Sequence, residues 1–407
     1  MELSEQEFMN FVNKRPEKNF FQTVSMMNKI KKDGKEVYLV GVKEEGKIIG
    51  ASLIAETGHK FLGKKTYEAY KGYVLDYRNN DLLRFMTNEV KKFLQKKKAL
   101  RLIIDPYIQN LPRDADANIV DGIDNRPVRE YLKRLGYVYN ENGEQVKWTY
   151  CLDIKGKTAE EIFNEMKSSK RNIINKTISK FKLNIRTLKR NELSEFKKIT
   201  SEASERREFD DKPLSYYEKM YDCFKDEVTF KICELNCDVY IDSLEEENKI
   251  LKEKLDKLSD ALANRKKKEN IELDINNNNK KIEEAKELKE KMGNIIPLAG
   301  AMFMLYGDEV VYLFSGSYSN LMNYCGQYRL QWEMIKYAAD NKYRRYNFYG
   351  IEDVFNPQGK DRGVYEFKKG FGGYVEELLG SFILPISPFN GLYELLRKIK
   401  GMLKLHR

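Results

Sequence analysis

The chain has 407 residues, 41% of them hydrophobic and 33% charged, with a formal net charge of +10 at pH 7. This length exceeds one ordinary core and predicts at least two globular domains, and the basic excess favours an anionic partner such as nucleic acid or a membrane surface. The sequence contains no apolar run of about 20 residues, as a membrane-spanning helix needs, and its acidic start lacks the apolar core of a signal peptide. We therefore expect a cytoplasmic or peripheral protein.

The first third of the chain alternates between strand and helix patterns. Apolar periodicity and breaker residues define these segments, and Glu44 to Gly46 predict a hairpin turn between the first two strands. In chain order we predict strands over 36–43 and 46–56, a helix over 80–99, a strand over 100–107, a helix over 128–135 and a strand over 146–152. Together they predict a small mixed α/β domain over residues 1–152.

The same kind of pattern starts again after residue 152. Thr158 and Glu161 have the spacing of a capping box at the start of a long helix. We predict helices over 157–181, 193–205, 214–224 and 320–340, and strands over 183–188, 227–235, 296–307, 309–317, 343–350 and 364–380. The sequence therefore predicts a second α/β unit built from residues 153–237 and 295–407.

A segment with heptad spacing, residues 238–294, interrupts the second unit. One register of its first half holds Ile241, Asn248, Leu255 and Leu262, and the companion register holds Leu244, Leu251 and Leu258. The second half carries Ile275, Ile282, Ala285 and Met292. This pattern predicts two helices folded back as an antiparallel coiled coil with one buried asparagine. The arm is either purely structural or contacts a partner, and RNA is one candidate through the basic residues at its tip: Arg265, Lys266, Lys267 and Lys268.

Residues 392–407 predict a basic amphipathic helix. Its apolar face holds Leu392, Leu395, Leu396, Ile399 and Leu403, and its charge comes from Arg397, Lys398, Lys400, Lys404 and Arg407. Such a helix lies on an anionic membrane surface or packs on its own domain, and the sequence leaves both possibilities open.

Histidine and cysteine supply little catalytic chemistry here. Two histidines are too few for a conventional serine or cysteine triad, and the five cysteines have neither disulfide nor zinc spacing. Any catalysis must therefore use lysine, aspartate, tyrosine, backbone groups or the substrate itself. No metal is expected.

The segment "FKKGFGG", residues 367–373, is the strongest candidate for a reactive centre. Gly370 and Gly372 fit the acyl-CoA loop of GNAT acetyltransferases, but Phe367 replaces the Arg or Gln of that loop, and the following residues read as a strand. The lysine pair instead suits charge that develops on an ester oxygen or a phosphate. From the reference pKa of lysine, we expect both to be cations at pH 7.

Seven segments together resemble the FemABX family of peptidyltransferases, which use aminoacyl-tRNA to add residues to the stem peptide of peptidoglycan. In the family's order they are "FFQTVSMMNKIK", "LIIDPY", "SERREFDDKPLSYYEKMY", the coiled-coil insertion, "YLFSGSYSN", "LQWEMIKYAADNKYRRYNFYGI" and "GVYEFKKGFGGYV". The resemblance covers nearly the whole chain. It implies an α/β (α+β) fold of two tandem GNAT-like subdomains plus a helical arm.

For the transfer centre, the resemblance implies roles for Phe367 and Lys368. Lys368 would stabilise charge on the aminoacyl ester or its tetrahedral intermediate, and Phe367 would position the terminal adenosine of the tRNA. The role of the neighbouring Lys369 stays open. Asp105 would orient or deprotonate the attacking amine, or would merely cap its strand.

For the acceptor, the resemblance implies a lysine eight residues after Gln22. That position is Ile30 here, so Lys29 or Lys31 would take the role. Lys212 and Tyr216 match a family pair of a basic residue and a tyrosine four positions later. The remaining implied contacts are Arg206 and Arg207 for phosphate, and Tyr312 or Phe314 for the muropeptide.

The implied reaction transfers glycine, alanine or serine from aminoacyl-tRNA to an amine of the stem peptide or of an earlier-added residue. The acceptor would be lipid-linked (lipid II) or a UDP-muropeptide, and no metal, nucleotide or CoA cofactor would be needed, because an aminoacyl ester is already activated. The basic C-terminal helix would then meet the cytoplasmic face of an anionic membrane. The alternatives are a GNAT-type acyl-CoA N-acyltransferase and a non-catalytic protein that binds RNA or membrane.

Overall fold

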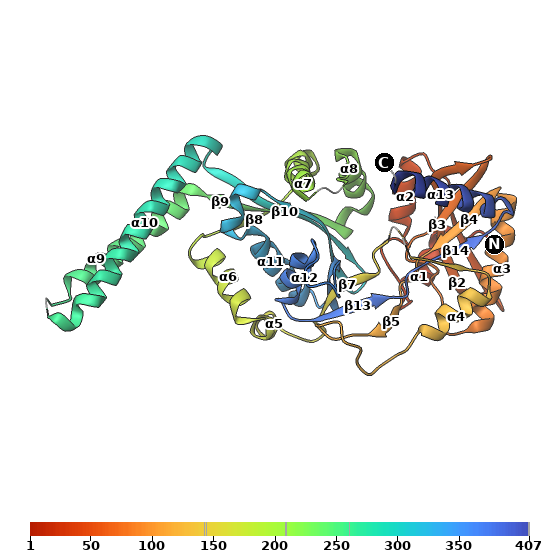
Figure 1. The fold of residues 1–407 in the computed structure, drawn as a ribbon, viewed down its shortest axis with the longest axis horizontal. Helices are drawn as coiled ribbons and strands as arrows, with labels where there is room; N and C mark the ends of the chain where they lie inside the picture. Colours follow the sequence, from red (N-terminus) through yellow and green to blue (C-terminus); the bar gives the residue numbers. More distant parts are fainter. Residues whose placement is uncertain (142, 144, 208–209, 260, 406–407) are drawn as a thin grey trace.

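The computed structural model describes the backbone of residues 1–405 apart from 142, 144, 208–209 and 260. Two β-sheets lie side by side, and a long helical arm projects from the far end of the second sheet (Figure 1). The strand order is β1-β2-β3-β4-β14-β6 in the first sheet and β5-β13-β7-β12-β11-β10-β9-β8 in the second. The expectation of an α/β protein with two sheet-based units and an arm is confirmed.

The first sheet is built mainly from the N-terminal part of the chain. Its strands are β1 (Val37–Glu44), β2 (Lys47–Phe61), β3 (Lys64–Ala69), β4 (Ala99–Ile104), β6 (Val138–Asn140) and β14 (Ser381–Pro385). Its helices are α1 (Glu5–Val12), α2 (Val24–Lys32), α3 (Asn80–Lys96) and α4 (Arg126–Arg134). Glu45 and Gly46 both have positive φ, which suits the two-residue turn predicted between β1 and β2.

The second sheet is covered by helices on both faces. Its strands are β5 (Gln109–Pro112), β7 (Trp148–Asp153), β8 (Asn184–Thr187), β9 (Val228–Asn236), β10 (Ile295–Tyr306), β11 (Glu309–Ser317), β12 (Arg345–Gly350) and β13 (Tyr374–Leu378). One face packs on α5 (Ala159–Glu165), α6 (Ser168–Ser179), α11 (Gly326–Asp340) and α12 (Arg362–Lys369), and the other on α7 (Leu193–Arg207) and α8 (Leu214–Phe224). The core under α7 and α8 continues into the first domain through Phe8, Phe20 and Met26.

The two sheets divide the chain differently from the predicted domains 1–152, 153–237 and 295–407. β5 and β7 belong to the second sheet, and β14 returns to the first sheet, where it pairs with β4 and β6. The chain crosses between the sheets within Leu379 and Gly380. Gly380 has a φ of 97°, and an added Cβ would lie 2.8 Å from the Tyr139 ring. Periodicity identifies a strand but not the sheet that it joins.

Two predicted elements also differ in type or length. Residues 364–380 were expected to form one strand, but Lys368 lies in α12 and only the later part of the segment, β13, is extended. Tyr365 and Lys368 are three residues apart on the buried side of that helix, a spacing that a strand would not place on one face. The predicted helix over 157–181 is broken at Met166, whose ψ of 153° is extended.

The arm consists of α9 (Cys237–Asp256) and α10 (Arg265–Met292), packed against each other as predicted. Asn248 is buried and exchanges side-chain hydrogen bonds with Asn278 and Asn279, at 3.1 and 2.9 Å. These partners explain why the asparagine run does not break α10. The predicted heptad extends too far, because Leu262 lies beyond α9 and is 88% exposed.

A buried ionic cluster binds together the segments that cross between the sheets. Arg345 on β12 pairs with Glu309 on β11 and with Glu376 on β13, each at 2.7 Å. The Arg345 guanidinium also donates to the hydroxyl of Tyr107, at 2.6 Å, and that hydroxyl donates to Glu309. Tyr107 lies in the connection from β4 to β5. The cluster therefore fixes how the chain passes from the first sheet to the second.

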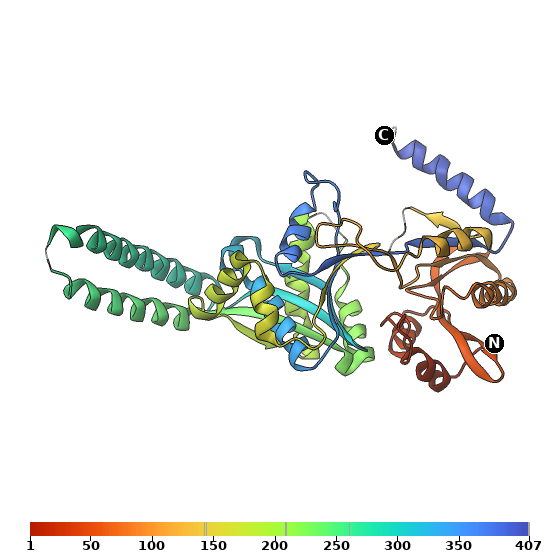
Figure 2. The same cartoon turned by 90° about the horizontal axis from the view of Figure 1, so that it is seen from below.

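The C-terminal helix α13 (Phe389–Leu405) lies along the outer side of the first domain (Figure 2). Arg101 on β4 pairs with Glu394, and the Arg101 guanidinium lies 4.5 Å from the ring centre of Tyr393. The predicted Lys398, Lys400, Leu403, Lys404 and Arg407 side chains lie outside the described part of the chain. No helix that the structure describes is long and apolar enough to cross a membrane.

Candidate active site

Lys368 is a buried lysine at the C-terminal end of α12. Its Nζ donates to the backbone oxygen of Gly350, at 2.6 Å, and lies 5.9 Å from the ring centre of Tyr312. Burial, together with the nearby Arg207 guanidinium, lowers the pKa of Lys368 to about 7. Burial therefore works against the cationic form that the reference pKa of lysine leads us to expect at pH 7.

Tyr312, Arg206 and Arg207 lie near Lys368 but make different contacts. The Tyr312 hydroxyl is hydrogen-bonded to Ser315 Oγ at 2.5 Å and to Gln327 Oε1 at 3.1 Å, so it is held in place beneath Lys368. Arg207 pairs with Asp361, which directly precedes α12. Arg206 instead donates to the backbone oxygen of Ser317 at 3.2 Å. Of the two predicted arginines, Arg207 is the one whose charge acts on Lys368.

Phe367 belongs to an aromatic cluster on the other side of α12. Its ring centre lies 4.9 Å from that of Tyr328 and 5.4 Å from that of Phe371. Lys170 of α6 covers this cluster, because its Nζ donates to the Tyr328 hydroxyl at 3.0 Å and lies 5.8 Å from the Phe367 ring centre. Neither Lys170 nor Tyr328 was predicted from the sequence.

Lys369 points away from both groups. Its Nζ pairs with Asp116 and lies 5.9 Å from the ring centre of Tyr365. This contact anchors α12 to the loop after β5. In this geometry Lys369 contributes an ion pair to the structure, and its contact with substrate stays a prediction.

The predicted acceptor residues meet between α2 of the first domain and α8 of the second. Lys29 Nζ lies 4.6 Å from the ring centre of Tyr216, and Lys212 Nζ lies 5.9 Å from it. Lys31 points elsewhere, with an exposed side chain 3.9 Å from Glu5. Of the two lysines that flank Ile30, Lys29 is the one that the fold brings to Tyr216.

Asp105 forms a buried ion pair that the sequence did not predict. One carboxylate oxygen accepts from the backbone N–H of Lys71, and the other lies 2.9 Å from Lys71 Nζ. Burial raises the pKa of Asp105 although Lys71 opposes the shift. Because both oxygens face Lys71, the carboxylate is held in one orientation and is not a free base. Lys71 Nζ also donates to the backbone oxygen of Val146, at 3.2 Å.

These groups converge at the end of β12. Gly350, the acceptor for Lys368, packs so closely on Val146 that an added Cβ would lie 2.8 Å from the valine side chain. The adjacent Tyr349 is partly buried, and desolvation raises its pKa with added contributions from Asp105 and Tyr216. Lys368, the Asp105–Lys71 pair and the Tyr216 group therefore surround one region at the boundary of the two domains.

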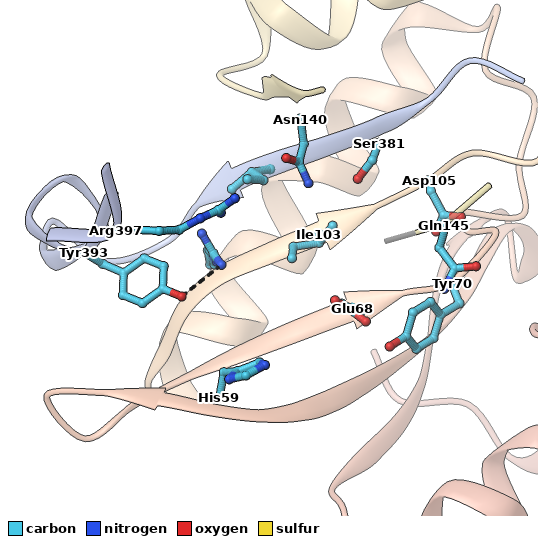
Figure 3. Close-up of a pocket in the computed structure, with 12 residues that line it drawn as sticks. His59, Glu68, Tyr70, Ile103, Asp105, Asn140, Gln145, Ser381, Tyr393 and Arg397 are labelled. Carbon is cyan, nitrogen blue, oxygen red and sulfur yellow. Dashed lines mark hydrogen bonds between the residues drawn. The ribbon is translucent and has the colours of Figure 1, made fainter. Parts of the chain in front are cut away.

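A cavity of about 290 Å³ leads from this region along the first sheet to α13. Figure 3 shows Asp105, Tyr70 and Gln145 at one end and Tyr393 and Arg397 at the other. The remaining lining residues are His59, Glu68, Arg101, Ile103, Asn140, Ser381 and Ile383. Its walls expose polar and apolar atoms in about equal measure and carry both signs of charge. The described residues contain no group of three or more His, Cys, Asp or Glu placed to hold a metal ion.

Comparison with known proteins identifies the family of this chain. Residues 3–400 match the sequence profile of the FemAB family. The chain belongs to the FemAB family. It is 32% identical over 414 aligned residues to "Aminoacyltransferase FemA" of Staphylococcus aureus, strains bovine RF122 / ET3-1 and MW2, with 98% of each chain covered.

The fold agrees with this FemAB assignment. The crystal structure of FemX superposes with a TM-score of 0.75 at 22% identity and covers 97% of this chain and 98% of its own. The predicted family, the α/β fold and the aminoacyltransferase class are therefore confirmed. The roles of individual residues in this FemAB protein stay predictions.

Proposed function

We propose that this FemAB protein moves an aminoacyl group from tRNA to an amine of a peptidoglycan stem peptide, in the region bounded by Lys368, Asp105 and Tyr216. The attacking nitrogen forms a C–N bond to the ester carbonyl and loses a proton. The ester C–O bond breaks, and the ribose oxygen of the tRNA gains a proton. The observation that carries this proposal is the buried Lys368, whose single described hydrogen-bond partner is a backbone carbonyl.

Lys368 acts on the tetrahedral intermediate. A buried cation stabilises an oxyanion far better than a solvated one, because little water screens the charge. A lysine with a pKa of about 7 supplies this cation, and it releases its proton readily once the intermediate collapses. The Asp105–Lys71 pair holds the end of β4 and the neighbouring backbone in place, so its role is orientation.

The acceptor phosphates occupy the opposite side of the region. Lys29 and Lys212 provide two cations beside Tyr216, one from each domain. Lysine binds phosphate as a point charge without the bidentate geometry of arginine. The stem peptide then extends toward Asp105, at one end of the cavity along the first sheet.

The rate should depend on pH through Lys368. With an acceptor whose amine is a lysine side chain, of pKa about 10.4, kcat/KM is expected to rise with pH up to about 7 and then level off. Above that pH the gain in neutral acceptor is offset by the loss of the Lys368 cation. The measurement is kcat/KM between pH 6 and pH 8.5, with wild type and the always-charged Lys368→Arg compared. A wild-type rate that keeps rising above pH 7 as steeply as below would show that Lys368 does not act as a cation.

The acceptor is lipid-linked, and α13 lies at the membrane. Glu394 and Tyr393 of this helix face the protein, since Glu394 pairs with Arg101 and Tyr393 packs on Phe61. Four of its described apolar side chains are exposed: Leu392, Leu395, Leu396 and Ile399. An amphipathic helix with this orientation and a basic sequence suits an anionic bilayer surface.

Placing charge on this outer face should release the protein from membranes. The double variant Leu392→Glu/Leu395→Glu is expected to lose most of its co-flotation with vesicles of phosphatidylglycerol and phosphatidylcholine. The arm variant Ile250→Glu/Leu273→Glu also replaces two exposed apolar residues and should float as wild type does. If both variants float with vesicles to the same extent, α13 is not the part of the protein that contacts the membrane.

The function itself is tested by supplying defined donors. Wild type is incubated with Gly-, Ala- or Ser-tRNA and either lipid-linked muropeptide or UDP-muropeptide, and the added mass is read by mass spectrometry. We expect one charged tRNA to support transfer to the lipid-linked acceptor. Transfer from acetyl-CoA in place of tRNA would instead establish an acyl-CoA N-acyltransferase.

A further inference from the structure

The segment that contains α6 carries positive charge without any negative residue. Between residues 166 and 191 there is no Asp or Glu, whereas the basic residues are Lys167, Lys170, Arg171, Lys176, Lys180, Lys182, Arg186, Lys189 and Arg190. Arg186 and Arg190 pair with carboxylates from other elements. Within the described part of the chain, none of the six cations from Lys167 to Lys182 forms an ion pair.

These cations are arranged at a cost to the helix itself. Lys176 and Lys180 are exposed and one turn apart, a spacing at which like charges repel. Lys170 and Arg171 lie in the first turn of α6, where the helix dipole disfavours cations. The helix is anchored by the buried Ile174 and Thr177. Two of its cations also make internal contacts: Arg171 donates to the backbone oxygens of Asn164 and Met166, and Lys176 Nζ lies 4.8 Å from the ring centre of Phe181. A surface of this kind indicates a polyanionic partner.

The position of α6 connects this charge to the transfer centre. The backbone N–H of Lys167 donates to the backbone oxygen of Gly370, at 3.2 Å, directly after α12. The Lys170 side chain crosses Gly370 so closely that an added Cβ would lie 2.1 Å from its Cε. The helix α6 is about 18 Å long, at roughly 1.5 Å per residue. A nucleic-acid backbone that lies along α6 therefore ends beside Phe367. Figure 2 shows α5 and α6 on the face turned toward the viewer.

We propose that α6 is the surface on which the acceptor end of the donor tRNA lies, and that Tyr328 joins Phe367 and Lys170 in holding its terminal base. Lys167, Lys176, Lys180 and Lys182 face the phosphates. The inference rests on the proposed use of aminoacyl-tRNA. An aromatic pair beside a cation suits a nucleobase, whereas a membrane would need an apolar face, and the one large apolar side chain that α6 exposes is Ile178.

The arm tip is the competing basic surface. It carries Arg265, Lys266 and Lys267, but Arg265 pairs with Glu269, and the tip lies at the opposite end of the arm from α12 (Figure 1). Two exposed lysines can be replaced on each surface, so that variants of α6 and of the arm tip lose the same charge and their tRNA binding can be compared directly.

The test measures binding of uncharged tRNA at several salt concentrations. Lys176→Ala/Lys180→Ala should weaken binding at least 10-fold at low salt and reduce the slope of log K against log salt by about 1.4 to 1.8, as expected for two lost phosphate contacts. Lys266→Ala/Lys267→Ala should bind as wild type does. The melting temperature of the α6 variant should change little, because both lysines are exposed and the lost contact between Lys176 and Phe181 is offset by the removal of a repulsive pair.

An unchanged slope of log K against log salt in the α6 variant would overturn the inference, and so would a reduced slope in the arm-tip variant alone. The inference also fails if the α6 variant loses vesicle flotation but still binds tRNA as wild type does. Two further variants test the base contact. Tyr328→Ala should raise KM for charged tRNA, and Tyr328→Phe, which keeps the ring, should restore it; a KM equal to wild type in Tyr328→Ala overturns that part. If wild type itself transfers nothing from charged tRNA, the proposed function fails, whereas the salt slopes still decide whether α6 binds RNA.

Discussion

Replacing Lys368 by methionine is expected to lower kcat for aminoacyl transfer about 10²- to 10³-fold, the typical effect of removing one preorganised donor to an oxyanion. Methionine fills a similar volume, so α12 keeps its packing against Tyr312. The buried Gly350 carbonyl loses its donor, which costs about 1–3 kcal/mol, but removal of a buried amine offsets part of that cost. Single-turnover rates with saturating charged tRNA measure the loss, and thermal unfolding shows that the fold is retained.

The neighbouring lysine provides the control. Lys369→Met removes the same charge one residue along α12, where the ammonium pairs with Asp116. Its kcat should stay close to that of wild type. A Lys368→Met protein with full activity, or an equal loss in both variants, would mean that the chemistry does not depend on Lys368.

The replacement Arg345→Met should destabilise the protein by about 3–5 kcal/mol, because it leaves two buried carboxylates without their cation. Glu309 and Glu376 are each less than a tenth exposed, and Arg345 supplies the charge that both of them contact. The Tyr107 hydroxyl would lose its donor as well. Urea unfolding, followed by circular dichroism, gives the change in the free energy of unfolding.

The adjacent arginine is the matched control for this prediction. Arg344 pairs with Asp308 at 2.9 Å, but both side chains are nearly half exposed, so Arg344→Met should cost at most about 1 kcal/mol. Adding Glu309→Gln and Glu376→Gln to Arg345→Met should recover much of the lost stability. Equal destabilisation by the two single variants would refute the importance of burial at Arg345.

The sequence was sufficient for the class of fold and for most of the elements. Apolar patterning located β9, β10 and β11 and placed α8 at Leu214–Phe224, because those segments are long and rich in buried apolar residues. It could not assign β14 to the first sheet, since the alternation of a short strand carries no information on its partner. It also misread α12, whose buried side includes a lysine where a pattern of apolar residues would be expected.

The candidate site was predictable only in part. Motif resemblance named Lys368, Phe367, Lys29, Lys212 and Tyr216, and the fold brings the last three together although they lie on different domains. Lys71 escaped notice because a single lysine between strands looks like any surface lysine. Its ion pair with Asp105 depends on a contact between residues 34 positions apart, which no local pattern encodes. The signal for Lys170 was present in the acid-free basic segment but was not used.

The return of β14 to the first sheet has a consequence for biosynthesis. β4 and β6 emerge from the ribosome early, but the strand that separates them, β14, is translated only after every strand of the second sheet. Until then both strands carry unpaired edges, which readily pair with other chains. The nascent polypeptide therefore exposes an unpaired edge of β4 for most of its synthesis. A premature stop codon shortly before residue 381 would damage the domain made first, and the defect would appear as aggregation.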